Sequence, residues 1–275
     1  MAAELVPFGV LLRRWRERRR LTQGELALSA DSSTRHLSYL ETGRAHPSRE
    51  IVLRLAEHLE IPLRDQNLLL LAAGFAPVFE ERPLAELDAA RQAIELVLAA
   101  HHPYPAFAVD RHWNIVLSNS ALPQLYEDCA PELMAKPVNA IRLILHPRGL
   151  GPRVLNFLEW RAHSVAVLRQ QNEVRADPVI RGLLAEIAAY PVPAGGEAVP
   201  VSWEDARRYA TPLRIATRMG PVSFLNTTTI FGTPTDVTLS ELALETLFPA
   251  DKQTVEIARK MTEETGAGAG IRLVR

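Results

Sequence analysis

Residues 21–44, LTQGELALSADSSTRHLSYLETGR, predict two short helices joined by a tight turn. Thr22 suits the N-cap of the first helix, because a glutamate three residues later completes a capping box. Ser33 suits the N-cap of the second helix, whose Leu37 and Leu40 point inward together and leave the polar side chains outside. A helix held across a preceding helix in this way can enter a DNA major groove. An ordinary helical hairpin with a solvated polar face is the alternative.

Basic residues gather just before this stretch. Residues 8–20 are expected to form a helix that carries Arg13, Arg14, Arg16, Arg18, Arg19 and Arg20, opposed only by Glu17. Residues 1–75 contain eleven arginines and nine acidic residues, a net charge of +2. The remainder has twenty basic and twenty-three acidic residues, a net charge of −3, and the two sum to −1. A basic N-terminal region is expected for phosphate contacts, which favours DNA binding over a plain hairpin.

Residues 8–73 resemble the five-helix DNA-binding domain of Cro and phage repressors, also called the XRE type. The resemblance rests on LTQ at 21–23, LSYLETGR at 37–44 and PS at 47–48. Two further helices are expected, over 48–59 and 62–73. The resemblance implies an all-α, λ-repressor-like domain that binds a double-stranded DNA operator. It also implies a homodimer, because such domains bind two half-sites about one helical turn apart.

The same resemblance assigns roles to individual residues. Thr34, Arg35 and Tyr39 match the positions that face bases, and Arg44 matches a phosphate contact. Gln23 matches a residue that contacts backbone phosphate or neighbouring side chains. The full set expected at the DNA is Gln23, Ser33, Thr34, Arg35, Ser38, Tyr39 and Arg44. Glu41 is expected to be structural. The turn departs from the family pattern of Gly and an apolar plug, since it carries Asp31 and Ser32, so looser packing is expected there.

Composition limits the remaining possibilities. A chain of 275 residues predicts two domains, and its single cysteine, Cys129, excludes a disulfide framework and a thiolate zinc cluster. The chain has no long apolar run and no signal-peptide pattern, so a soluble cytoplasmic protein without a membrane partner is expected. Its histidines lack metal-ligand spacing. It has neither a nucleophile elbow nor a phosphate-binding glycine loop. We therefore expect no enzyme, no metal and no cofactor.

The domains are expected at 1–75 and 85–265, with a linker at 76–84 and a mobile tail at 266–275. Residues 84–100 predict an amphipathic helix. Strands are expected at 106–109, 113–118, 213–217, 222–231 and 237–247, and helices at 139–145, 152–171, 178–189 and 251–261. A first hairpin that leads into a helix capped by Asn119 resembles the start of a PAS domain. The second domain is therefore expected to be α+β, with a pocket between sheet and helices.

A second resemblance covers nearly the whole chain. It rests on HPYPA at 102–106, DRHWN at 110–114, LHPRGL at 145–150, NFLEWRA at 156–162 and FPAD at 248–251. Together these motifs resemble the MmyB-like family of bacterial transcriptional regulators. The resemblance implies an XRE-type domain joined to a PAS-like ligand-binding domain, and it suggests a fatty acid as the ligand.

The residues allow a carboxylate site for such a ligand. Arg153, Asn156 and Trp160 have the i, i+3, i+7 spacing of one face of the expected helix 152–171, near its N-terminus. Arg153 can donate two hydrogen bonds to a carboxylate, and Asn156 can donate a further one. Trp160 can line the path of the ligand's alkyl chain. The expected apolar wall is Phe107, Val109, Trp113, Ile115, Phe157, Phe224 and Leu225. Alternatively, Arg153 pairs with an internal acid and Trp160 is plain core. Arg142 and Arg161 are rival anchors.

These expectations combine into a ligand-responsive, dimeric, DNA-binding transcription regulator that binds a small lipophilic acid. Two alternatives remain. In one, the PAS-like domain only holds the dimer together and binds no ligand. In the other, it is a redox or haem sensor, against which the missing cysteine pair and the lack of an obvious axial ligand both count.

Overall fold

The computed structural model describes residues 6–194, 211–232, 234–264 and 270–273. Within these ranges the chain divides into two compact units. Of the described residues, the helical unit contains 6–83 and 234–240. The sheet unit contains residues 84–232 and those from 241 onward. No helix in the described ranges is long and apolar enough to cross a membrane.

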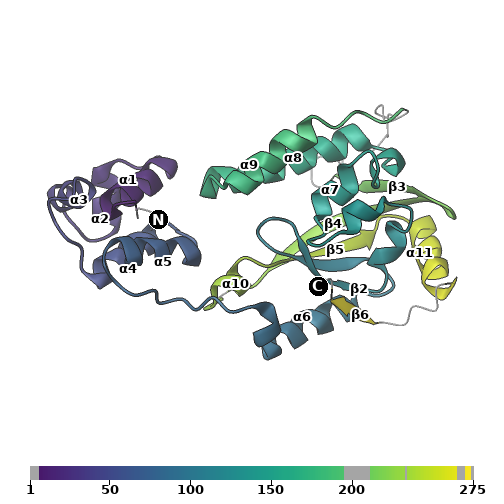
Figure 1. The fold of residues 1–275 in the computed structure, drawn as a ribbon, viewed down its shortest axis with the longest axis horizontal. Coiled ribbons are helices and arrows are strands. Elements are labelled where there is room, and N and C mark those ends of the chain that lie inside the picture. The colour runs from purple at the N-terminus through teal and green to yellow at the C-terminus, as the bar shows by residue number, and fades with distance from the viewer. Residues whose placement is uncertain (1–5, 195–210, 233, 265–269, 274–275) are drawn as a thin grey trace. The chain divides into compact units, whose positions relative to one another are not determined.

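The helical unit contains the five helices that the sequence predicts (Figure 1). They are α1 (Phe8–Arg18), α2 (Gln23–Ser29), α3 (Thr34–Glu41), α4 (Arg49–His58) and α5 (Leu63–Ala72). Their apolar faces meet in one core, in which Leu12, Leu26, Leu37 and Leu40 are almost completely buried. The all-α class of this domain is therefore confirmed.

The caps that delimit α2 and α3 form as predicted. Thr22 Oγ1 accepts the backbone N–H of Glu25 at 3.2 Å, and the Glu25 carboxylate accepts the N–H of Thr22 at 2.7 Å. Ser33 Oγ accepts the N–H of His36 at 3.1 Å. Between the helices, Asp31 adopts a left-handed conformation with φ of 48°, where the family pattern has glycine. The turn thus forms without glycine.

Residues just after α5 are tied to that helix. The Asn67 side chain accepts the N–H groups of Val78 and Phe79 and donates to the Phe79 carbonyl at 2.7 Å. The short helix α10 (Val237–Ser240) belongs to the same unit. There Arg82 Nε lies 3.3 Å from Asp236 Oδ2. The segment expected as a linker is therefore held to the helical unit by defined hydrogen bonds.

The sheet unit is built on one antiparallel sheet in the order β3-β4-β5-β1-β2-β6. The strands are β1 (Ala106–Val109), β2 (Ile115–Asn119), β3 (Leu213–Thr217), β4 (Gly220–Ile230), β5 (Ala243–Pro249) and β6 (Ile271–Leu273). The α-helices are α6 (Asp88–Ala100), α7 (Ala140–Leu145), α8 (Phe157–Arg175), α9 (Pro178–Ala188) and α11 (Lys252–Glu264). The 3-10 helices are η1 (Leu84–Glu86), η2 (Leu122–Leu125), η3 (Pro131–Met134) and η4 (Gly151–Arg153). The predicted α+β class is confirmed.

Helices lie on both sides of this sheet. Figure 1 shows α7, α8 and α9 on one side and α6 on the other. Side chains of β1 and β2, such as Phe107 and Ile115, share a core with Phe157 and Leu168 of α8. On the other side, α6 buries Ile94 and Leu98. The main core of this unit therefore lies between the sheet and helices α7 to α9.

Three predictions about this unit need correction. The helix expected over 152–171 is split, because Pro152 lies in the 3-10 turn η4, which begins at Gly151, and the α-helix starts at Phe157. The strand expected over 237–247 instead consists of helix α10 followed by strand β5. Residues 271–273, expected in a mobile tail, pair with β2 as strand β6, and residues 265–269 lie outside the described ranges.

Asn119 also has a different role from the expected helix cap. It ends β2 with its side chain buried. There Oδ1 accepts the N–H of Ala106 at 3.1 Å, and Nδ2 donates to the carbonyls of Leu98 and Tyr104. A buried amide with several backbone partners fixes strands and helix relative to one another, which explains why a polar residue is placed there.

Candidate functional site

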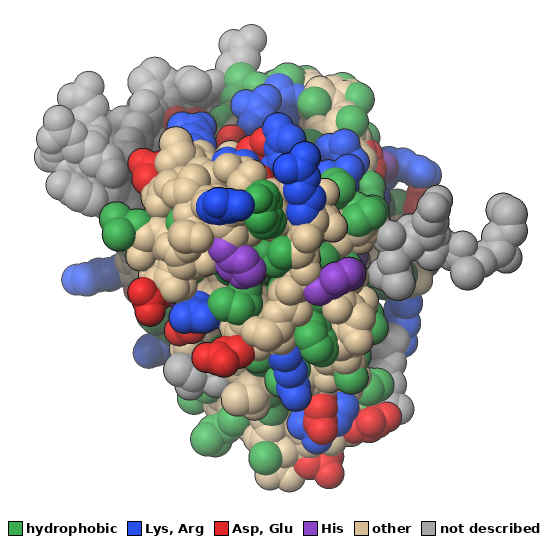
Figure 2. Space-filling view, turned by 90° about the vertical axis from the view of Figure 1, so that its left-hand side faces the viewer, with side chains coloured by type: hydrophobic (Ala, Val, Ile, Leu, Met, Phe, Trp, Pro, Cys, Tyr) green, Lys and Arg blue, Asp and Glu red, His purple; other side chains and the backbone are tan. Residues whose placement is uncertain are grey.

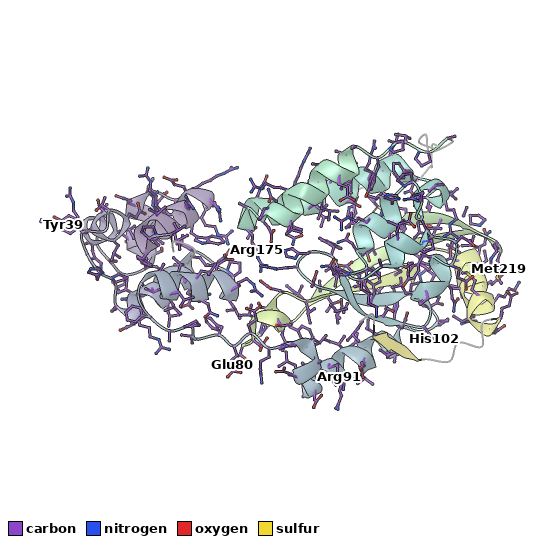
Figure 3. The ribbon with its side chains drawn as sticks, viewed as in Figure 1. Tyr39, Glu80, Arg91, His102, Arg175 and Met219 are labelled. Atoms are coloured by element: carbon purple, nitrogen blue, oxygen red, sulfur yellow. The ribbon has the colours of Figure 1, made fainter. Side chains whose placement is uncertain are left out.

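Helix α3 presents a polar outer face. Thr34 and Arg35 are exposed, Ser38 and Tyr39 are half-buried, and the inward side chains of Leu37 and Leu40 belong to the core. Figure 3 shows Tyr39 on the outer side of α3. In Figure 2, which looks onto this side of the molecule, Lys and Arg side chains gather toward one end of the face. The expected base-facing residues thus share one accessible surface.

Arg35 and Tyr39 act as a pair on this surface. The Arg35 guanidinium donates to the Tyr39 hydroxyl from Nε at 3.2 Å and from Nη2 at 3.0 Å, and its carbon lies 5.4 Å from the ring centroid. These contacts orient both side chains along the outer face of α3. A guanidinium held in one orientation can donate two hydrogen bonds to a guanine, one to O6 and one to N7.

Gln23 and Ser33 make contacts within the domain. Gln23 Nε2 donates to Glu41 Oε2 at 2.8 Å, so it contacts a neighbouring side chain, one of the two roles expected for it. Ser33 uses its hydroxyl as the N-cap of α3. Arg44 follows the left-handed Gly43 and its side chain is exposed. It is therefore accessible to a phosphate beyond the C-terminus of α3.

The arginines of 13–20 have divided roles. Arg16 is buried against Glu41, and Arg19 donates to the carbonyls of Leu59 and Glu60. Arg13 pairs with Glu17 at the surface. Part of the positive charge that the sequence places in this helix therefore holds the domain together. The sequence gives no means to separate these roles, because each residue is simply an arginine in an amphipathic helix.

The sheet unit contains an apolar cavity between the sheet and helices α7 and α8. Its volume is about 50 Å³. Most of its wall is aliphatic or aromatic, with Phe107, Trp113, Ile115, Leu122, Leu125, Tyr126, Ile141, Leu143, Ile144, Leu150, Trp160, Val167, Leu213, Ile215 and Leu247 among the lining side chains. Polar side chains in the wall are His163, Ser164, Asn226 and Glu245. Among its described lining residues, none is an arginine or a lysine.

The expected ligand residues are only partly brought together. Phe107, Trp113 and Trp160 line the cavity. Phe157 and Phe224 are buried in the same core but are not among its described lining residues. Aromatic residues of this core therefore divide between the cavity wall and ordinary packing.

Arg153 and Asn156 lie outside the cavity wall described here. Arg153 Nη2 donates to the Leu125 carbonyl at 2.7 Å, and Nη1 lies 3.4 Å from Asp128 Oδ2. Asn156 donates to the Pro212 carbonyl and accepts the N–H of Arg214. The shared helix face expected for these residues and Trp160 does not form, because α8 starts only after Asn156.

The rival anchors have partners of their own. Arg142 forms a two-pronged contact with Glu186, with N···O distances of 2.8 to 2.9 Å, and this hydrogen bonding keeps the pKa of Glu186 below its usual range. Arg161 donates to the Tyr190 carbonyl at 3.0 Å and stacks on Phe157. Neither is among the described residues that line the cavity.

Family models match both units. Residues 90–261 match the MmyB-like transcription regulator ligand binding domain, and residues 7–69 match a helix-turn-helix domain. The chain belongs to the MmyB-like transcription regulators. No curated protein matches it. This MmyB-like regulator is thus a DNA-binding transcription regulator with a ligand-binding domain, and these domains point to a non-enzymatic function.

The polar residues of the regulator's cavity were missed by sequence reasoning. Glu245 is 1% exposed, and burial raises the pKa of its carboxyl. Burial also lowers the pKa of His163, so its imidazole favours the neutral form. A signal for Glu245 exists in ALETLFP, because the acid stands inside an apolar strand.

Proposed function

We propose that this MmyB-like regulator binds a DNA operator as a cytoplasmic homodimer and responds to a lipophilic ligand of the fatty-acid size class. Helix α3 reads bases, and the cavity of a PAS-like sheet unit holds the ligand. Ligand binding shifts the relative position of the two reading heads and so changes operator affinity.

The observation that carries the ligand proposal is the apolar cavity under helices α7 and α8. Aromatic and aliphatic side chains from the sheet, such as Phe107 and Leu247, face those of the helices, such as Trp160. Each methylene buried in such a wall contributes about 0.8 kcal/mol. The cavity measures about 50 Å³, so a long chain enters only as lining side chains shift.

Calorimetric titration of the delipidated full chain with straight-chain acids and alcohols of increasing length tests this proposal. Affinity is expected to rise with chain length until the cavity can widen no further. If no chain of either kind binds, the lipophilic ligand is wrong, and a sheet unit that only holds the dimer together becomes the better explanation.

The DNA part of the proposal has a separate test. An operator selected from random sequence is expected to contain two half-sites whose centres lie about 10 base pairs, or a multiple, apart. Sedimentation of the protein with this operator is expected to give two chains per duplex. A selected site with a single half-site bound by one chain would overturn the homodimer.

A further inference from the structure

The cavity has a polar end on strands β4 and β5. Glu245 lies opposite Phe107 on one side and Thr228 on the other in the antiparallel register. Directly opposed residues of neighbouring strands point to the same face of a sheet. The Glu245 side chain therefore faces the same side as Phe107, whose ring lines the cavity. Asn226, two residues before Thr228, lies on this face as well and also lines the cavity.

Neutral donors hold the Glu245 carboxyl in place. Asn226 Nδ2 donates to Oε2 at 2.7 Å, and Thr228 Oγ1 donates to Oε1 at 3.0 Å. In the described part of the chain, no arginine, lysine or histidine forms an ion pair with Glu245. This end of the cavity thus offers acceptor oxygens without a nearby compensating positive charge.

Two cavity-lining polar atoms lack a partner in the described structure. One is Asn226 Oδ1, an acceptor, and the other is the indole Nε1 of Trp160, a donor. Asn226 is held with its nitrogen toward Glu245, which leaves its oxygen available. A buried polar atom without a hydrogen bond destabilises the protein, and a ligand group that pairs with it binds more tightly for that reason.

We propose that Asn226 and Glu245 select the ligand by a hydrogen-bond donor, the hydroxyl of an alcohol-type head group, and discriminate against a carboxylate. This inference rests on the proposed function, since it assumes that the cavity takes a lipophilic molecule. A hydroxyl can donate to Asn226 Oδ1 or to the Glu245 carboxyl. A carboxylate can only accept, so it leaves Asn226 Oδ1 without a partner. It also brings a negative charge into a poorly solvated site whose described lining contains no arginine or lysine to compensate it.

The test compares dodecanol with dodecanoic acid by calorimetric titration of the delipidated full chain at about pH 8, where the acid is ionised in water. The alcohol is expected to bind at least about tenfold more tightly than the acid, the ratio that one unsatisfied buried hydrogen bond produces. Equal binding, or tighter binding of the acid, would overturn the head-group assignment alone. Binding of neither probe would overturn the lipophilic cavity and the assignment with it.

A test variant and a control variant show whether Glu245 determines the selectivity for alcohol over acid. Glu245→Gln keeps the size of the side chain and adds a donor in place of a carboxylate oxygen, so the alcohol-to-acid ratio is expected to fall to within about threefold. Arg153→Ala is the matched control, because Arg153 is directed to Leu125 and Asp128, and it is expected to leave the ratio unchanged. An unchanged ratio in Glu245→Gln, or a changed ratio in Arg153→Ala, would contradict the proposal.

Discussion

Arg16 and Glu41 form a buried, two-pronged ion pair that joins helix α1 to helix α3. Arg16 Nε lies 2.6 Å from Glu41 Oε1, and Nη2 lies 2.9 Å from Oε2. Gln23 of α2 adds a third hydrogen bond to the same carboxylate. Three helices thus meet at one acidic side chain at the C-terminal end of α3. The orientation of α3 is fixed by this network, which connects its last turn to the rest of the domain.

Breaking this pair should destabilise the helical unit. Arg16→Ala leaves a buried carboxylate without its cation, and the expected loss in the free energy of unfolding is about 3 kcal/mol. Arg13→Ala is the control, because Arg13 pairs with Glu17 at the surface and its removal should cost at most about 1 kcal/mol. Calorimetry of the full chain measures both. Equal losses would show that burial does not govern the Arg16 contact.

Arg35 should determine base preference. Arg35→Ala is expected to weaken operator binding by about 1–3 kcal/mol and to relax selection at one base pair, a guanine. Tyr39→Phe removes the hydroxyl that accepts from Arg35 and should broaden the same position more weakly. Binding to a panel of operator variants measures selectivity. Unchanged selectivity in Arg35→Ala would refute its base-reading role.

Arg44 should act on all sequences alike. Arg44→Ala is expected to weaken specific and non-specific duplexes by the same factor, since a phosphate contact carries no base information. The slope of log K against log salt should fall in magnitude by about 1. Titrations at several salt concentrations measure this slope. A loss confined to one operator would mean that Arg44 contacts a base.

Two glycines in the helical unit should respond in opposite ways to alanine. A Cβ at Gly9 would lie 2.4 Å from the Leu40 carbonyl oxygen, so Gly9→Ala must push α1 away from α3 and should destabilise by about 1–3 kcal/mol. Gly24 has helical geometry, and a Cβ there would meet no atom closer than 3.9 Å. Gly24→Ala should stabilise by about 0.5–1 kcal/mol. Thermal unfolding of each variant checks the signs.

Glu245 should make stability fall as pH rises. Its folded-state pKa is raised by burial, so the folded protein holds a proton that the unfolded chain releases. Stability is therefore lost between the usual glutamate pKa and the raised folded value. Glu245→Gln removes this dependence, and its stability relative to the natural protein should improve as the pH rises above the usual glutamate pKa of about 4.3. A difference that does not vary with pH would contradict the assignment.

Local signals in the sequence were sufficient to predict the helices of the helical unit and the caps of α2 and α3. The caps at Thr22 and Ser33 rely on side chains that bond a backbone N–H three residues away, so the pattern and the contact are in the same short segment. The outward position of Thr34 and Arg35 follows from the inward position of Leu37. The partner of Gln23 could not be predicted with the same certainty, because Glu41 is eighteen residues away and reaches it through tertiary packing.

The sheet unit was harder to predict because its decisive contacts are distant in sequence. The start of α8 at Phe157 depends on Asn156, whose side chain bonds Pro212 and Arg214 more than fifty residues later. The interruption between η4 and α8 leaves Arg153 outside the helix that carries Trp160, so the expected shared helix face does not form. Glu245 and Asn226 come together through strand register, which a single strand pattern does not contain.

Helix α10 has a consequence for protein engineering. The chain passes between the two units after Pro83, after Gly232 and again after Ser240. The segment before β5 supplies Asp236 to Arg82 and the N–H of Val237 to the Glu80 carbonyl. A chimera that exchanges DNA specificity between relatives at a single junction after Pro83 would therefore combine a reading head from one parent with α10 from the other. A matched exchange has to transplant residues 233–240 together with residues 1–83.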